Sequence, residues 1–118
     1  MKELIALLFL AREIAHREHL KTRSFAAHMA LNEFYTGIIE NADAIAEAYQ
    51  GQYGKLLSIP YMKNPNKASI ESIFRNHLDW IEKNRYNDVP VTQTAIQNLI
   101  DEAVSTYQTA LYKLKFLF

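Results

Sequence analysis

The positions of the helix-breaking residues constrain this chain more than any other feature. All three prolines (Pro60, Pro65 and Pro90) and two of the three glycines (Gly51 and Gly54) fall in two short segments. Proline removes a helix hydrogen bond and glycine weakens a helix interior, so the long stretches outside these segments are free to form continuous helices. This distribution predicts an all-α chain with few interruptions.

Apolar residues recur at helical spacing in each long stretch, and no alternating strand pattern competes with them. The expected helices run from about 2 to 19, 24 to 50, 67 to 85 and 92 to 116. Ser24 is the expected N-cap of the second helix and Gly51 its expected end. We expect one further short helical turn around Leu56, inside the long connection that follows.

The lengths of the connections predict how the four helices are arranged. A short polar turn at 21–23 joins the first pair, a long segment at 51–66 joins the second helix to the third, and a short turn ending near Pro90 joins the last pair. One long crossover between helices two and three is typical of the ferritin-like four-helix bundle. At 118 residues the chain is about the size of one domain, so we expect a single domain over 1–118.

Composition excludes several classes of function. Thirteen basic and thirteen acidic residues give no net charge, which argues against a dedicated nucleic-acid binder. The absence of cysteine removes thiolate metal sites, and the most apolar stretch, Leu4 to Ala11, is too short to span a bilayer. No phosphate-binding glycine loop or hydrolase triad stands out. We therefore expect a cytoplasmic protein, located in the host cytoplasm if a phage encodes it.

Polar residues on the second helix form one strip beside its apolar stripe, at steps of three and four residues. The strip consists of His28, Asn32, Tyr35, Ile39, Asp43 and Glu47. A strip of this kind usually faces another helix. It contains an imidazole at one end and two carboxylates at the other.

The ends of the strip are too far apart to share one metal ion within a single chain. Fifteen helical positions separate His28 from Asp43, which corresponds to roughly 22 Å. Two copies packed antiparallel about a twofold axis bring His28 of one copy to Asp43 and Glu47 of the other. The centre of this arrangement lies beside Gly37, and a glycine inside a helix is consistent with close backbone approach there. We therefore expect a homodimer or higher homo-oligomer formed through this helix.

Imidazole nitrogen with carboxylate oxygen is a donor set suited to iron, manganese or zinc. His19, near the end of the first helix, is the natural additional ligand, and His16, one turn earlier, is a substitute for it. We expect a metal site of His19 and His28 with Asp43 and Glu47, the carboxylates coming from the second copy.

The residues His19-Leu-Lys-Thr, Phe25-Ala-Ala-His28 and Asp43-Ala-Ile-Ala-Glu47 resemble the ferroxidase segment of the Dps mini-ferritins. The resemblance covers about a quarter of the chain in motif and all of it in helix order. It implies iron binding between subunits, with oxidation of Fe(II) as the associated activity. The chain would be a compact, divergent member of that family, of phage or bacterial origin, without the lysine-rich tail by which some members bind DNA.

One position of the motif favours a second hypothesis. Asn32 stands where the Dps family usually has an aspartate, and Glu33 could replace that carboxylate only if the helix rotated. The loss of this anionic ligand makes metal binding the stronger expectation and ferroxidase turnover the weaker one. The alternative is a non-enzymatic helical-bundle protein that dimerises or binds a partner and has lost the metal.

Two further features remain outside this site. His77 lies between Phe74 and Ile81 at helical spacing, and no carboxylate partner is indicated, so we expect a structural or surface role. An aromatic C-terminus, containing Tyr112, Phe116 and Phe118, is either the end of the core helix or an oligomer contact.

Overall fold

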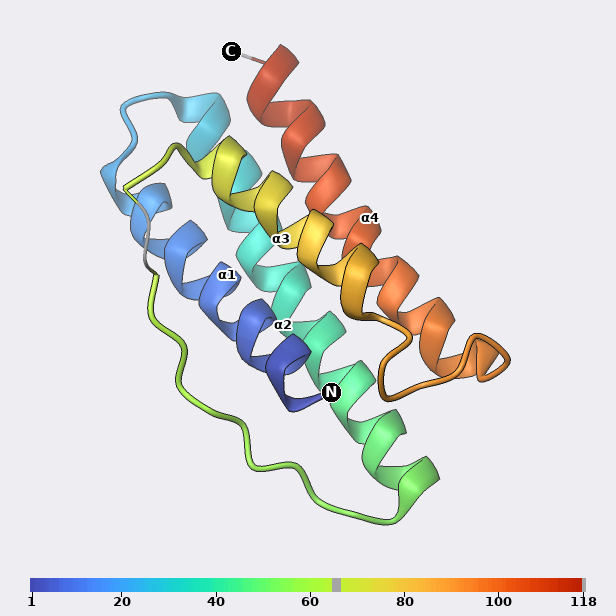
Figure 1. Cartoon of the computed structure of the whole chain (residues 1–118). Helices are drawn as coiled ribbons and strands as arrows, with labels where there is room; N and C mark the ends of the chain where they lie inside the picture. Colours follow the sequence, from blue (N-terminus) through green and yellow to red (C-terminus); the bar gives the residue numbers. More distant parts are fainter. Residues whose placement is uncertain (65–66, 118) are drawn as a thin grey trace.

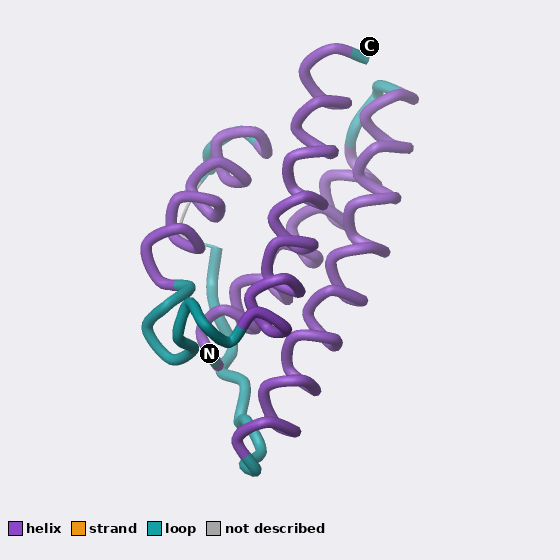
Figure 2. Tube along the Cα trace, turned by 90° about the vertical axis from the view of Figure 1, so that its right-hand side faces the viewer, coloured by secondary structure: helices purple, strands orange, loops and turns teal. Residues whose placement is uncertain are grey.

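The computed structural model describes residues 1–64 and 67–117, and it is helical in all its regular elements (Figures 1 and 2). The four helices are α1 (Lys2–Lys21), α2 (Phe25–Tyr53), α3 (Ile70–Asn84) and α4 (Thr94–Phe116). No strand occurs in the described ranges. The prediction of an all-α chain with four helices is confirmed, and the bounds agree to within about three residues. No helix in the described part of the chain is both long and apolar enough to cross a membrane.

The helices form a closed ring in the order α1, α2, α4, α3. In Figure 1, α2 runs opposite to α1, whereas α3 runs in the same direction as α2 and α4 returns beside both of them. The parallel direction of α2 and α3 requires the chain to travel back along the whole bundle between them. The segment from Gly54 to Ser69 makes this crossover, and Leu57, Ile59 and Met62 within it pack against the core.

Capping residues fix where the helices begin. The Ser24 side chain accepts a hydrogen bond from the Ala27 backbone N–H, which confirms its predicted role as the N-cap of α2. Ser69 caps α3 in the same way by accepting from the Ser72 N–H, so α3 starts at Ile70 rather than near 67.

The predicted end of α2 at Gly51 is wrong. The helix continues through Gly51 to Tyr53, and Gly54 ends it in the left-handed conformation, with φ of 66°. This backbone conformation suits glycine because in any other residue the Cβ would lie too close to the following backbone carbonyl oxygen. The predicted helical turn around Leu56 is also wrong, since the chain there is irregular and Leu56 is exposed.

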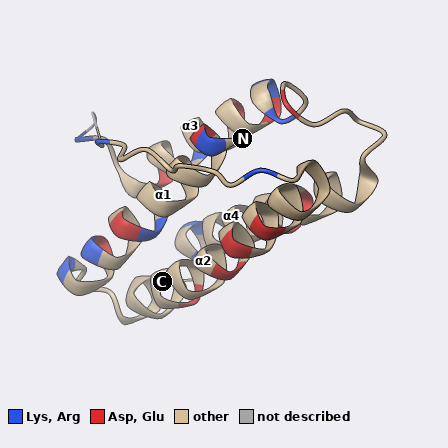
Figure 3. Ribbon diagram, turned by 90° about the horizontal axis from the view of Figure 1, so that it is seen from below, with Lys and Arg blue, Asp and Glu red and all other residues tan. Residues whose placement is uncertain are grey.

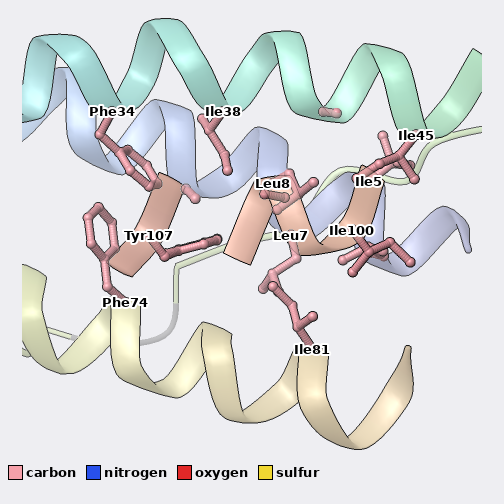
Figure 4. Close-up of a cluster of buried hydrophobic side chains, with 14 of the residues drawn as sticks. Ile5, Leu7, Leu8, Phe34, Ile38, Ile45, Phe74, Ile81, Ile100 and Tyr107 are labelled. Carbon is pink, nitrogen blue, oxygen red and sulfur yellow. The ribbon is translucent and has the colours of Figure 1, made fainter. Parts of the chain in front are cut away.

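Aromatic rings join three of the helices at the centre of the core (Figure 4). Phe34 from α2 reaches across the bundle to Phe74 from α3, with ring centroids 4.3 Å apart. Tyr107 from α4 lies edge-on to both, at 5.1 Å from Phe34 and 5.2 Å from Phe74. Aliphatic side chains of α1, including Ile5 and Leu8, complete the fully buried core.

Candidate functional site

His19 and His28 hold together the end of α1 and the beginning of α2. The His19 Nδ1–H donates to the backbone carbonyl of His28 at 2.7 Å, and the His28 Nδ1–H donates to the backbone carbonyl of His19 at 2.9 Å. The His19 carbonyl lies in the last turn of α1, where helix carbonyls lack partners within the helix. The two histidines therefore close the tight turn between the helices.

These hydrogen bonds determine the state of both imidazole rings. A carbonyl oxygen can only accept, so each Nδ1 carries a proton and each Nε2 is the nitrogen left for another partner. A backbone carbonyl on one ring nitrogen is the usual arrangement for a histidine that binds metal through the other. His28 is half-buried, whereas His19 is buried.

The two imidazole rings are stacked face to face, which limits what they can bind together. Their centroids are 3.7 Å apart and their planes differ by 19°. An imidazole nitrogen binds a metal through a lone pair in the ring plane, and the lone pairs of stacked rings lie in two separate, nearly parallel planes. In this arrangement the lone pairs of His19 and His28 do not converge on one ion, and the half-buried His28 is the more accessible of the two rings.

Tyr35 links the remaining polar residues of this end. Its hydroxyl donates to Asn32 Oδ1 at 2.8 Å, so that oxygen has a partner within the chain. Its ring stacks on His16 with centroids 4.5 Å apart and meets His19 edge-on at 5.3 Å. The first half of the polar strip, from His28 to Tyr35, therefore faces α1 of its own chain. The His16 ring packs on Tyr35.

The carboxylates of the strip lie apart from the histidines. Asp43 and Glu47 are exposed on the second half of α2, and neither has an ion-pair partner in the described ranges. Across residues 1–64 and 67–117, no three His, Asp or Glu side chains gather closely enough to hold a metal ion. Glu33, named as a substitute ligand, instead pairs with Lys113 of α4.

Gly37 lies on the side of α2 that faces α4. A Cβ built on it would sit 3.5 Å from Thr106 Cγ2, and Thr106 in turn donates to Asn41 Oδ1 at 2.7 Å. The residue that approaches Gly37 closely is thus Thr106 of α4 in the same chain. Its role as the crossing point of a dimer stays a prediction.

Charge is unevenly distributed over the helices. α2 contains Glu33, Glu40, Asp43 and Glu47 but no lysine or arginine. Figure 3 shows acidic segments along the ribbons of α2 and α4. The net neutrality of the sequence therefore conceals an acidic helix, whose field attracts cations.

The most deeply buried polar pair in the described part of the chain joins α3 to α4, and spacing along the sequence did not predict that these two side chains meet. His77 of α3 and Tyr107 of α4 are 8% and 0% exposed, and His77 Nδ1 lies 2.9 Å from the Tyr107 hydroxyl oxygen. Burial lowers the pKa of His77 from 6.5 to about 4 and raises the pKa of Tyr107 well above 10. Of the two roles expected for His77, structural or surface, its burial supports the structural one. Only the apolar spacing around each residue hinted at this burial.

The aromatic C-terminus is exposed where it is described. Tyr112 and Phe116 contact each other, with ring centroids 5.7 Å apart, and are 55% and 60% exposed. Phe118 lies outside the described residues.

These features define an all-α four-helix bundle with a histidine-closed turn and an acidic second helix. Residues 19–114 match a family described as a family of unknown function (DUF5856), and the chain belongs to that family. The matched range includes His19, His28, Asp43 and Glu47. No curated protein and no solved structure matches the chain.

Proposed function

We propose that this chain is a ferritin-like, Dps-like protein that binds a divalent metal ion between two copies of itself. The helix order and the long crossover after α2 support the ferritin-like part of the proposal. The ligands would be His28 of one copy with Asp43 and Glu47 of the other. His19 would hold the His28 backbone and ring in place.

The observation that carries the proposal is that three polar groups of the strip on α2, one imidazole nitrogen and two carboxylates, are available to bind a ligand. The His28 ring is fixed through Nδ1, which leaves Nε2 for a ligand, and both carboxylates are exposed without ion pairs in the described part of the chain. One imidazole nitrogen with two carboxylates fits iron, manganese or zinc. Bound Fe(II) would be the substrate of an oxidation by oxygen or peroxide.

The acidic character of α2 favours a metal over a metal-free pairing. Two such helices packed through the strip would bring Asp43 and Glu47 of both copies, four carboxylates, to one interface with no lysine or arginine from either helix. Like charges at a contact disfavour association. A divalent cation at each end of the interface offsets that repulsion.

Two observations favour the second candidate, a bundle that pairs or binds a partner without metal. The stacking of His19 on His28 prevents both rings from binding one ion, and Asn32 Oδ1 is already bonded to Tyr35. In this case the histidines serve only to close the turn between α1 and α2.

Metal content measured by mass spectrometry after loading with Fe(II) or Zn(II) and desalting separates the two candidates. The proposal predicts about one ion per chain, because a twofold dimer has two equivalent sites. H28A and E47A should each abolish stoichiometric binding, since each removes a ligand. E82A, which removes an exposed carboxylate of α3, should bind as the unmodified chain does. A dimer that binds no metal would establish the second candidate instead.

A further inference from the structure

A cavity lies between α1, α3 and the crossover, away from the polar strip of α2. Its volume is about 290 Å³, near the lower end of the range of small-molecule sites. Most of its wall is apolar and comes from Leu7, Leu10, Met62, Ile73 and Trp80. Two neighbouring hollows share Leu10 and Met62 with it. One of them, which also contains Phe9 and Ile39, is mostly apolar and extends the apolar surface, whereas charged residues such as Glu13 and Arg17 line the other.

One buried polar side chain, His77, lines this cavity. His77 lines the wall and is only 8% exposed, and its Nδ1 is taken by Tyr107. His77 Nε2 has no hydrogen-bond partner among the described residues. Every fully buried side-chain nitrogen or oxygen in the described ranges does have a partner, so Nε2 cannot be one of the fully buried atoms. The cavity that His77 lines is the space beside this ring from which a ligand can approach it.

The hydrogen bond with the Tyr107 hydroxyl determines which ring nitrogen of His77 carries the proton. Tyr107 is fully buried and His77 is its hydrogen-bond partner, so an O–H that did not donate would be left without an acceptor. The hydroxyl therefore donates to Nδ1, and the proton of the neutral imidazole is on Nε2. His77 thus brings a fixed N–H donor to a wall that is mostly apolar and whose other uncharged polar residues are Asn64 and Asn76.

A cation completes the polar part of the cavity. Lys63 of the crossover lines it and is exposed, so its ammonium can remain in water at the rim. Among the described residues, no aspartate or glutamate lines the cavity. A donor, a cation and an apolar wall together select a ligand that is anionic at one end and apolar at the other.

We propose that this cavity binds a medium-chain fatty acid. The carboxylate accepts from His77 Nε2–H in the field of Lys63, and the alkyl chain lies along Leu7, Leu10 and Met62. The site is separate from the metal site proposed on α2, and neither depends on the other.

Octanoate, kept well below its micelle-forming concentration, tests this in the full-length chain. Trp80 is the only tryptophan and lines the cavity, so its fluorescence reports occupancy. We expect a saturable change with octanoate, and at least tenfold weaker binding of 1-octanol, which has the same chain length but no charge. The His77 Nε2–H resonance should shift on octanoate binding. Absence of saturation, or equal affinity for octanol, would overturn the proposal.

Matched variants locate the binding. N76F places a ring at the cavity wall from an exposed position of α3, and N98F makes the same change on an exposed position of α4 outside the cavity. We expect N76F to abolish octanoate binding and N98F to retain it. K63Q should weaken octanoate about tenfold and leave octanol unchanged. Equal effects of N76F and N98F, or no effect of K63Q, would contradict the assignment.

Discussion

Burial of the His77 ring makes its protonation state depend on folding. The folded chain keeps the imidazole neutral down to about pH 4, because the interior disfavours the charged ring, whereas the unfolded chain takes up a proton near pH 6.5. Between these two values the unfolded state binds the extra proton. Stability therefore falls as the pH falls through this window and is unaffected by His77 above it.

The contribution of His77 can be measured as the difference between two chains. Urea unfolding at pH 7 and at pH 4.5 measures the free energy of unfolding at each pH. For the unmodified chain, we expect His77 to lower this free energy by about 2–3 kcal/mol between pH 7 and pH 4.5. H77Q has no titrating ring at this position, so its free energy of unfolding should fall by about 2–3 kcal/mol less than that of the unmodified chain. H16Q, which changes a half-buried histidine on α1, serves as the control and should retain the full loss. Equal losses for H77Q and the unmodified chain would show that His77 is not held neutral.

At the residue scale, the sequence predicted types of environment better than partners. The apolar stripe of α2, from Leu31 to Tyr49, is buried as its spacing indicates. The His77–Tyr107 bond joins residues 30 positions apart, and helical spacing gives no information on which side chains meet across a bundle. The reciprocal bonds of His19 and His28 depend in the same way on the angle of the turn between two helices.

At the scale of single helices, the end of α2 shows why boundaries are harder to predict than elements. Both Gly51 and Gly54 are residues at which a helix can end, and the sequence alone favours the first of them. A glycine inside a helix costs only about 1 kcal/mol, which the packing of Tyr49 and Tyr53 on the same side can offset. The helix therefore ends where the backbone turns left-handed, at Gly54.

The two glycines should respond to alanine in opposite directions. G54A forces a Cβ into the left-handed conformation and should lower the free energy of unfolding by about 1–2 kcal/mol. G51A improves helix propensity where no atom lies within 4 Å of the new Cβ, and it should raise that free energy by about 0.5–1 kcal/mol. Urea unfolding of the two variants measures both changes. Destabilisation by G51A would show that α2 does not continue through this position.

At the scale of the whole molecule, the number and order of the helices follow from where prolines, glycines and polar turns interrupt the apolar pattern. The connection of 16 residues between α2 and α3, from Gly54 to Ser69, is what allows these helices to run in the same direction. The candidate metal site could be predicted only in part. His28, Asp43 and Glu47 lie on one helix and His19 at the end of the helix before it, as expected. The meeting of His28 with the two carboxylates requires a second copy, and the contacts of a second copy are set by surfaces that spacing along one helix does not describe.

Native mass spectrometry of the purified, metal-loaded chain tests the central claim most directly, because it measures copy number and bound metal in the same particle. We predict species with an even number of chains and about one divalent ion per chain. The loss of metal in H28A should leave the apoprotein with weakened association, since two acidic α2 helices would then face each other uncompensated. A monomer under these conditions, or an oligomer without metal, would contradict the account.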